Sequence, residues 1–381
     1  MSKLISALPK NLLCLSHLRW DFVFQRPQHL MTRFAREQNV FFLEEPIFDM
    51  DGKDFLSREK RDGDVTLLVP HLRSDKSAEE VQVSISNLLD EFLKSESMCD
   101  WMFWYYTPMA LQFSLKHRPA LVIFDCMDEL SAFDFAPKEL LMLEKKLMDI
   151  ADVVFTGGHS LYEAKKNRHN NIYAFPSSID KTHFAAARED TEEPEDQANI
   201  TGKKLGFFGV IDERFEIDLI GHIATARPDW QLILLGPVVK IAPESLPKHK
   251  NIHYLGQKSY QQLPAYLSGW DVALIPFKLN DSTRFISPTK TPEYLAAGVR
   301  VVSTPIRDVV KPYGTQRLVS IAEKHDDFVQ AIEKELQAAT DSAWLAKVDD
   351  FLSDKSWEHT FAAMKQQMLS ALKRPDTLLA S

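Results

Sequence analysis

Short apolar runs alternate with longer amphipathic stretches along most of the chain, and this pattern predicts strands that alternate with helices. In the first half the expected strands are 11–15, 40–43, 65–69, 101–105, 121–124 and 153–155. The helices expected among them are 30–35, 81–93 and 138–151. Because this alternation is typical of a parallel sheet covered on both faces, we expect a doubly wound α/β domain over residues 1–184.

A second alternating series predicts a second doubly wound domain over residues 202–345. Its expected strands are 205–208, 231–235, 252–254, 272–275, 301–302 and 319–321, and its helices are 217–225, 261–267, 292–297 and 328–339. The stretch 185–201 between the domains is rich in Asp and Glu and poor in apolar residues, so we expect a solvated linker or long surface loop there. A last amphipathic helix, 356–374, needs a surface to cover.

Length, composition and charge narrow the class of protein. With 381 residues the chain suits two domains, and no apolar run approaches the ~18 residues of a membrane span. The first residues lack the pattern of a cleaved leader, so we expect a cytoplasmic protein. Cys14, Cys99 and Cys126 have no metal-site spacing, and a net charge of −9 argues against nucleic acid as a partner.

Ligands of parallel sheets bind at the carboxyl ends of the strands, so we look for chemistry in the loops that follow them. Neither G-x-G-x-x-G nor G-x-x-x-x-G-K-[ST] occurs there, which disfavours a dinucleotide enzyme and a P-loop NTPase. The segment 287–298, SPTKTPEYLAAG, is present instead. Pro292 suits the first turn of a helix, so we expect the stretch from Ser287 to Lys290 at the helix start, where phosphate is attracted.

The side chains of this segment suit a nucleotide with phosphates and a ribose. Lys290 supplies a positive charge at the expected helix start, beside Ser287, Pro288 and Thr289. Glu293 follows three residues later and would face the same side, where its carboxylate can accept hydrogen bonds from ribose hydroxyls. The alternative is a strand–helix–strand unit that only happens to contain Lys and Glu.

This segment, continued by Arg300-Val301-Val302, resembles the S/N-x-K-x-x-E-Y-x-A-A-G-x-x-V-V signature of GT-B glycosyltransferases, in particular the family-4-like group with a glycosyltransferase family 1 domain. The resemblance implies two Rossmann-like domains facing across a cleft, with the final helix crossing back to the first domain. It also implies that Lys290 lies at the diphosphate and Glu293 at the ribose of a nucleotide sugar. By the same resemblance, Gly209 forms a turn near the diphosphate and Gln257 belongs to the turn that holds the base.

Two further features refine the resemblance. The opening segments 17–21 and 25–29 resemble glycosyltransferases of teichuronic-acid and other cell-surface polysaccharide biosynthesis. The departure is Phe285, which stands where the family usually has a second glutamate, eight positions before Glu293. We therefore carry over neither the donor sugar nor the retaining stereochemistry.

Several residues have both a catalytic and a structural reading. Arg214 would complement Lys290 at the diphosphate in place of a metal, or it is a surface arginine among acidic neighbours. In the first domain His17, Asp21 and Asp128 follow expected strands, and an inverting reaction would need one of them as a base. Asp128 could instead cap a helix, and His17 could be structural. We expect neither a metal site nor a cofactor.

The resemblance implies a metal-independent enzyme that transfers a sugar from a nucleotide sugar, which we expect to be UDP-linked, to a glycan or lipid-linked acceptor of the cell envelope. A lipid-linked acceptor would bring the protein into peripheral contact with the inner face of the cell membrane. Two alternatives stay open at this point. One is a UDP-sugar epimerase of the same fold, and the other is a non-catalytic binding partner, for which Phe285 is the motive.

Overall fold

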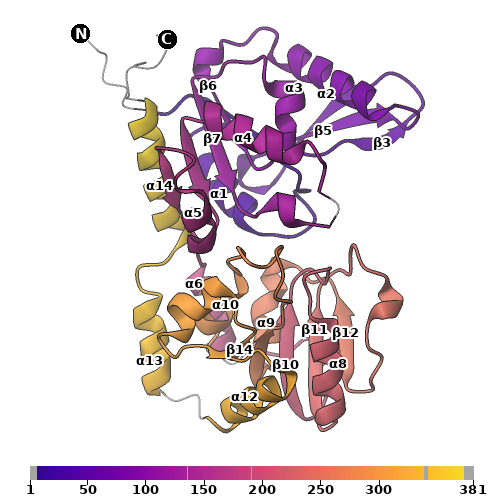
Figure 1. Cartoon of the computed structure of the whole chain (residues 1–381), viewed down its shortest axis with the longest axis vertical. Coiled ribbons are helices and arrows are strands. Elements are labelled where there is room, and N and C mark those ends of the chain that lie inside the picture. Colours follow the sequence, from indigo (N-terminus) through magenta and orange to yellow (C-terminus); the bar gives the residue numbers. More distant parts are fainter. Residues whose placement is uncertain (1–6, 135, 190, 339–341, 373–381) are drawn as a thin grey trace. The chain divides into compact units, whose positions relative to one another are not determined.

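The computed structural model describes residues 7–372 except 135, 190 and 339–341 (Figure 1). The chain divides into two compact units, and each has its own sheet. The first unit comprises Met1–Pro176 and Glu358–Ser381, and the second comprises Ser177–Trp357.

The first unit is built on one sheet of nine strands in the order β3-β5-β2-β1-β6-β7-β8-β9, with β4 also paired to β5. All pairings are parallel except that of β4 with β5. The strands are β1 (Asn11–Leu15), β2 (Asn39–Leu43), β3 (Ile47–Met50), β4 (Phe55–Lys60), β5 (Thr66–Arg73), β6 (Trp101–Tyr105), β7 (Leu121–Cys126), β8 (Val153–Thr156) and β9 (Ile172–Ala174). Every residue of β1 and β6 is buried, as expected for central strands with helices on both faces.

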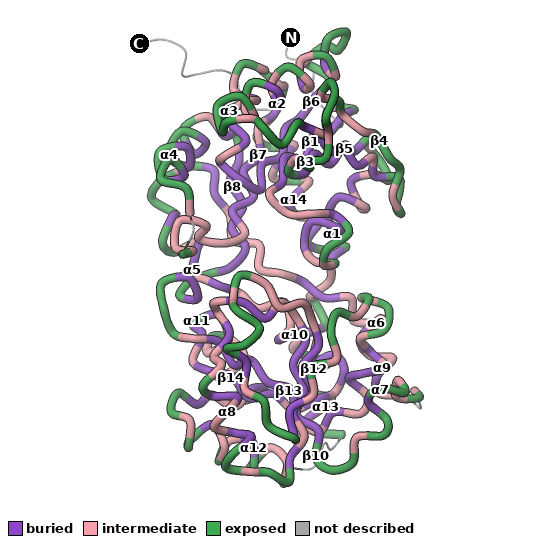
Figure 2. Tube along the Cα trace, turned by 90° about the vertical axis from the view of Figure 1, so that its right-hand side faces the viewer, coloured by how far each residue is buried: buried purple, intermediate pink, exposed green. Residues whose placement is uncertain are grey.

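The helices of the first unit follow the apolar stripes of the sequence. They are α1 (Arg26–Phe34), α2 (Ala78–Leu93), α3 (Leu111–Ser114), α4 (Leu140–Ile150), α5 (His159–Lys165) and α14 (Trp357–Leu372). The start of α2 is fixed by a capping box, in which the Ser77 hydroxyl accepts from the Glu80 amide and the Glu80 carboxylate accepts from the Ser77 amide. Buried and exposed positions alternate along α2 and α4, as expected of helices with one apolar face (Figure 2).

The last helix, α14, packs on α1. The Phe361 and Phe34 rings meet edge to face with centroids 4.8 Å apart, and Met364 and Met368 are fully buried. Around this apolar contact, Glu358 accepts hydrogen bonds from Arg33 and Arg36. The final helix therefore covers the first unit, although it follows the second unit in the sequence.

The second unit contains a six-stranded parallel sheet in the order β12-β11-β10-β13-β14-β15. Its strands are β10 (Lys203–Phe208), β11 (Trp230–Leu235), β12 (Ile252–Gly256), β13 (Val272–Ile275), β14 (Arg300–Ser303) and β15 (Ser320–Ile321). The main helices are α8 (Ile217–Ala226), α9 (Leu263–Leu267), α10 (Lys290–Ala296), α12 (His325–Gln337) and α13 (Ser342–Phe351). The strand order reverses between β10 and β13, which makes this pair the topological switch point of a doubly wound sheet.

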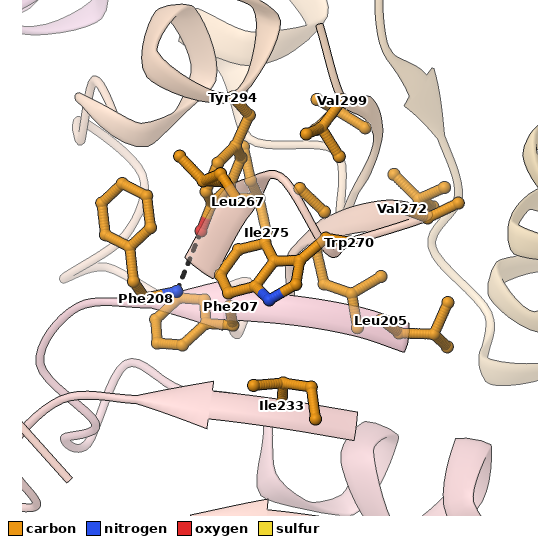
Figure 3. Packing of buried hydrophobic residues seen from close by; sticks show 14 of the residues in the cluster. Leu205, Phe207, Phe208, Ile233, Leu267, Trp270, Val272, Ile275, Tyr294 and Val299 are labelled. Carbon is orange, nitrogen blue, oxygen red and sulfur yellow. Dashed lines mark hydrogen bonds between the residues drawn. The ribbon is translucent and has the colours of Figure 1, made fainter. Parts of the chain in front are cut away.

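The core of the second unit joins α10 to the sheet. Tyr294 is fully buried, and its hydroxyl accepts a hydrogen bond of 3.1 Å from the Phe208 amide (Figure 3). The Tyr294 ring also meets the rings of Phe208 and Trp270. This packing fixes α10, and with it the segment 287–298, against the first strand of the sheet.

The acidic stretch 185–201 is not the solvated linker that its composition predicts. It contains the short helix α7 (Glu195–Ala198), follows α6 (Lys181–Ala185), and belongs to the second unit. Gln197 is fully buried, accepts from Trp270 Nε1 at 2.8 Å and donates to the Tyr266 carbonyl. The linker alternative is wrong because one buried amide and several ion pairs, among them Glu193 with Lys204, attach this surface segment to the core of the second unit.

Candidate functional site

The loops after β10 and β13 lie together at the switch point of the second sheet. Phe215 and Phe277 form an isolated antiparallel bridge, and the Glu216 amide donates to the Pro276 carbonyl at 2.8 Å. The Lys278 amide donates to the Arg214 carbonyl, also at 2.8 Å. This is the edge of an open α/β sheet where a bound ligand is expected.

Three neighbouring strands end there in glycines with positive φ. Gly209 follows β10 with φ 136°, Gly236 follows β11 with φ 139°, and Gly256 ends β12 with φ 71°. The Gly209 amide donates to the Leu235 carbonyl and the Gly236 amide to the Gly256 carbonyl. A Cβ atom on Gly236 would lie 1.9 Å from the Gly209 carbonyl oxygen. The two backbone segments can therefore lie this close together only because residue 236 has no side chain.

Lys290 is the first residue of α10, and its side chain reaches the glycine that follows β10. A Cβ atom on Gly209 would lie 2.6 Å from Lys290 Nζ, so the ammonium group lies directly against the Gly209 backbone. Nζ also lies 5.5 Å and 5.6 Å from the ring centroids of Phe207 and Phe277. The structure thus brings Gly209 and Lys290 together, although they are far apart in the sequence.

Glu293 lies one turn further along α10 and is 7% exposed. Burial raises the pKa of its carboxyl to about 8, and the charge of Lys290 opposes part of this rise. The pair therefore combines a cation with a carboxyl group that gives up its proton near neutral pH, at the edge where ligands of such sheets bind.

Ser287, Pro288 and Thr289 lie immediately before α10 and are half-buried. Thr289 is the N-cap residue, but its side chain makes no capping hydrogen bond. Pro292 lies in the first turn of the helix, as its sequence position predicts. Sequence reasoning missed Thr291, which is fully buried and whose hydroxyl has no hydrogen-bond partner among the described residues.

Arg214 lies in the loop after β10 and is held by an acidic neighbour. Its Nε and Nη2 atoms donate to the carboxylate of Asp212, the latter at 2.7 Å, and Asp212 is 3% exposed. This ion pair fixes the orientation of the guanidinium group, and it is the acidic neighbourhood that the structural alternative for Arg214 expected. Gln257 is exposed directly after Gly256, at the end of β12.

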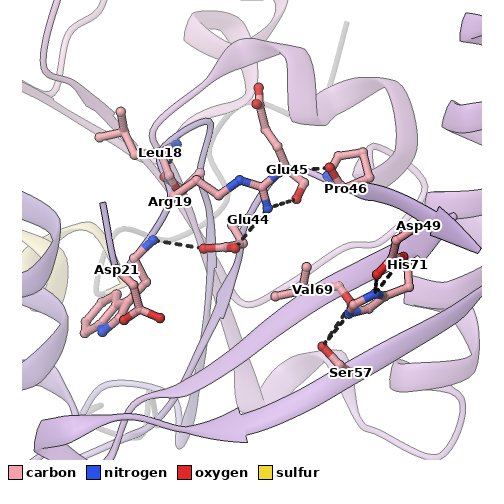
Figure 4. A network of polar contacts seen from close by, with 12 residues as sticks. Leu18, Arg19, Asp21, Glu44, Glu45, Pro46, Asp49, Ser57, Val69 and His71 are labelled. Atoms are coloured by element: carbon pink, nitrogen blue, oxygen red, sulfur yellow. Dashed lines mark hydrogen bonds and ion pairs between the residues drawn. The ribbon is translucent and has the colours of Figure 1, made fainter. Parts of the chain in front are cut away.

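The candidates of the first unit lie in loops at the carboxyl edge of its own sheet. His17 is half-buried in the loop after β1, which is anchored on the loop after β2 (Figure 4). Arg19 donates to Glu44, Glu45 and Pro46, and the Trp20 amide donates to Glu44 at 2.9 Å. Asp21 is mainly exposed and pairs with Arg61 at 3.0 Å.

Asp128 does not cap the helix that follows it. The N-cap position of the next helical turn, Leu130–Ala132, is Glu129, and its side chain makes no capping bond. Asp128 lies half-buried just after β7, so the capping alternative is wrong for this residue.

Among the described residues, no group of three or more His, Cys, Asp or Glu side chains could hold a metal ion. Within the same part of the chain, none of the helices has the length and apolar character to cross a bilayer.

Comparisons with known proteins agree with this architecture. Residues 202–338 match the family model Glycosyl transferases group 1. A relative from Bacillus subtilis (strain 168), named as the teichuronic acid biosynthesis glycosyltransferase TuaH, is 23% identical over 301 residues, which are 73% of this chain and 74% of the relative. The matched domain includes every donor-site candidate of the second unit.

Solved structures share the fold of nearly the whole chain. Sucrose-phosphate synthase from Thermosynechococcus elongatus has a TM-score of 0.68 at 14% identity, covering 94% of this chain and 98% of that structure. A UDP-forming trehalose-phosphate synthase from Burkholderia xenovorans has a TM-score of 0.66 at 12% identity, covering 96% and 99%. An E. coli structure bound with UDP-2-fluoro glucose has a TM-score of 0.69 at 11% identity, with the same coverage. The chain therefore has the GT-B fold and carries a domain of the Glycosyl transferases group 1 type over residues 202–338.

Proposed function

We propose that the second unit binds a UDP-sugar and that the enzyme transfers the sugar to a glycan or lipid-linked acceptor of the cell envelope. The observation that carries the donor site is the position of Lys290 Nζ against Gly209, with Glu293 one turn away. UDP is favoured because similar folds are bound with UDP-2-fluoro glucose or are UDP-forming. The acceptor class rests on the teichuronic acid role in the name of the B. subtilis relative.

The chemistry of the proposed site follows from its charges. Lys290 and the guanidinium group of Arg214 would stabilise the negative charge that develops on the leaving diphosphate, and no metal ion is needed for this role. Glu293 would accept hydrogen bonds from the ribose hydroxyls once it is ionised. Ser287, Pro288, Thr289 and the glycine strand ends would lie along the phosphates, and Gln257 would lie at the base.

The acceptor groups are proposed for the first unit. His17, Asp21 and Asp128 follow β1 and β7 and carry the groups that could take a proton from an acceptor hydroxyl. If the reaction inverts the sugar, one of them acts as the base. If it retains the configuration, they orient the acceptor. A lipid-linked acceptor would bring the enzyme into peripheral contact with the inner face of the membrane.

Calorimetric titration with UDP and GDP tests the donor site. We expect Lys290→Ala and Glu293→Gln each to weaken UDP binding at least tenfold, about 1.4 kcal/mol. Lys203→Ala is the matched control, because Lys203 starts the same strand, β10, that ends before Gly209, and its ion pair with Asp271 is exposed. The donor-site assignment is wrong if neither substitution weakens binding or if the control weakens it equally.

A second candidate function is a non-catalytic binding partner, and Phe285 favours it. This position usually carries a donor-sugar glutamate in the family, and here it has a half-buried ring with the Arg284 guanidinium 5.3 Å from its centroid. Transfer or hydrolysis of a UDP-sugar by the wild-type protein would exclude this candidate. Binding of UDP without either reaction, across a panel of UDP-sugars, would favour it.

A further inference from the structure

A fully enclosed arginine begins α1. Arg26 is 3% exposed, and three of its nitrogen atoms donate hydrogen bonds. Nε and Nη2 donate to Oδ2 and Oδ1 of Asp125, at 2.9 Å and 2.8 Å, and Nη1 donates to the Phe175 carbonyl at 2.7 Å. Asp125 lies in β7 and is 0% exposed, so one side chain ties the start of a helix to the ends of two strands.

Stability alone is a weak reason for such a pair. Removing both charges from water is costly, and well-packed apolar residues are often as stable in the same place. The surroundings of the pair are buried as well, since Cys14 and Tyr106 lie close to Asp125. Burial raises the pKa of Asp125, and Arg26, with a smaller contribution from Tyr106, opposes this rise and favours the charged carboxylate.

The pair lies between the two loops that carry the candidate acceptor groups. Arg26 directly follows the loop 16–25, which contains His17, and Asp125 lies three residues before Asp128. The loop 16–25 is already tied at its middle, since the Trp20 amide donates to Glu44 and the Trp20 carbonyl accepts from Gln28 of α1. Arg26 supplies the remaining connection, from the end of this loop to the strand that leads into the other.

We propose that Arg26 is a positioning residue, whose two-pronged contact with Asp125 holds the loop 16–25 and the residues after β7 in one fixed arrangement. Its planar fork suits this role, because a lysine offers a point charge and cannot hold both carboxylate oxygens and a carbonyl in a defined orientation. The importance of this arrangement for catalysis rests on the proposed function. The restraint on the loops does not.

Hydrogen–deuterium exchange of the full-length protein tests the restraint. In the double variant Arg26→Met, Asp125→Leu we expect the amides of Leu18, Trp20, Phe22 and Gln25, which are hydrogen-bonded in the structure, to exchange at least about tenfold faster. The thermal midpoint should stay close to that of the wild type, since the pair is replaced by apolar side chains. Arg33→Met is the control, because Arg33 lies on the same helix and pairs with Glu358 of α14.

A second measurement keeps the test decisive if the double variant folds poorly. The ¹⁹F spectrum of the fluorotryptophan-labelled protein reports Trp20, which packs edge to face on Phe42 within the loop contact. In Arg26→Lys, which keeps the charge, we expect the Trp20 resonance to shift or broaden while that of Trp230 in the second unit stays unchanged. The proposal is overturned if the loop amides exchange at the wild-type rate, or if exchange becomes faster by the same factor in all regions of the first unit.

Titration with UDP separates this inference from the proposed function. Arg26 lies in the first unit, so the Arg26 variants should bind UDP as the wild type does. Failure of the wild type to bind UDP would contradict the donor site and leave the loop measurement valid. Faster loop exchange with unchanged UDP binding supports the positioning role.

Discussion

At the scale of single residues, the buried carboxyl group of Glu293 makes the stability of the folded protein depend on pH. Burial raises the pKa of its carboxyl to about 8, so most of it is protonated at pH 7 in the free protein. The folded protein thus holds a proton that the unfolded chain, with the ordinary value of 4.5, has released. The contribution of Glu293 to the free energy of unfolding is therefore at its maximum below pH 4.5, and it is lost as the pH rises through 8.

We expect UDP binding to release protons near pH 7, because only the ionised carboxylate accepts from both ribose hydroxyls. Affinity should rise by up to about tenfold per pH unit below pH 8 and level off above it. Calorimetry at pH 7 in two buffers of different ionisation enthalpy measures the protons released. Glu293→Gln corrects for protons that UDP itself loses. Equal proton release by the wild type and this variant would contradict the role of Glu293.

The glycine strand ends give a second test at this scale. Gly236→Ala should lower the free energy of unfolding by roughly 1–3 kcal/mol, because its φ of 139° and its contact with the Gly209 carbonyl both exclude a side chain. Gly221→Ala is the control, since this glycine lies within α8 and an added Cβ atom would lie 3.6 Å from Pro247. For Gly221→Ala we expect the free energy of unfolding to increase by up to about 1 kcal/mol, because alanine has the higher helix propensity. Denaturant unfolding measures both, and a cost at Gly221 equal to that at Gly236 would refute the steric argument.

The sequence predicted some site residues because their spacing is local. Lys290 and Glu293 are three residues apart, so helical periodicity alone places them on one side. The partners of Arg26 and Lys290 could not be found in this way. Arg26 is separated from Asp125 by 99 residues, and Gly209 meets Lys290 only because β10 and α10 pack together.

At the scale of elements, α14 should be essential to the first unit. Met364 is fully buried in this helix, and Met364→Ala should lower the free energy of unfolding by about 2–5 kcal/mol. Met142 of α4 is 65% exposed, so Met142→Ala should change it by no more than about 0.5 kcal/mol. Thermal or denaturant unfolding of both variants checks this. Similar effects of the two substitutions would mean that α14 does not cover the core.

The elements that the sequence predicted are those with buried apolar faces. The strands β1, β6 and β13 have the predicted bounds, because continuous apolar runs mark strands buried on both faces. The pattern missed β3, β4 and β9. β3 and β4 are mainly exposed, and β4 carries Arg58, Glu59 and Lys60, so only their pairing with β5 makes them strands.

At the scale of the whole molecule, the two units should respond differently to UDP. A ligand that binds only the folded second unit stabilises that unit by about 2.7 kcal/mol at one hundred times its dissociation constant. We therefore expect added protection from hydrogen exchange in Leu232, Leu234 and their neighbours in β11, and none in β1 or β6 of the first unit. Lys290→Ala should abolish the protection. Protection confined to the first unit would contradict the assignment of the donor to the second.

The buried contact between Gln197 and Trp270 shows that the compact second unit extends beyond the stretch that matches the family model. The match to the family model begins at residue 202, yet the partners of Trp270 and Lys204 lie before it, at Gln197 and Glu193. A fragment that begins at residue 202 would lose the protein acceptors of the Trp270 indole N–H and of the Lys204 ammonium group. A fragment that begins at Ser177 keeps both, so the stretch that matches the family model is shorter than the compact unit that contains it.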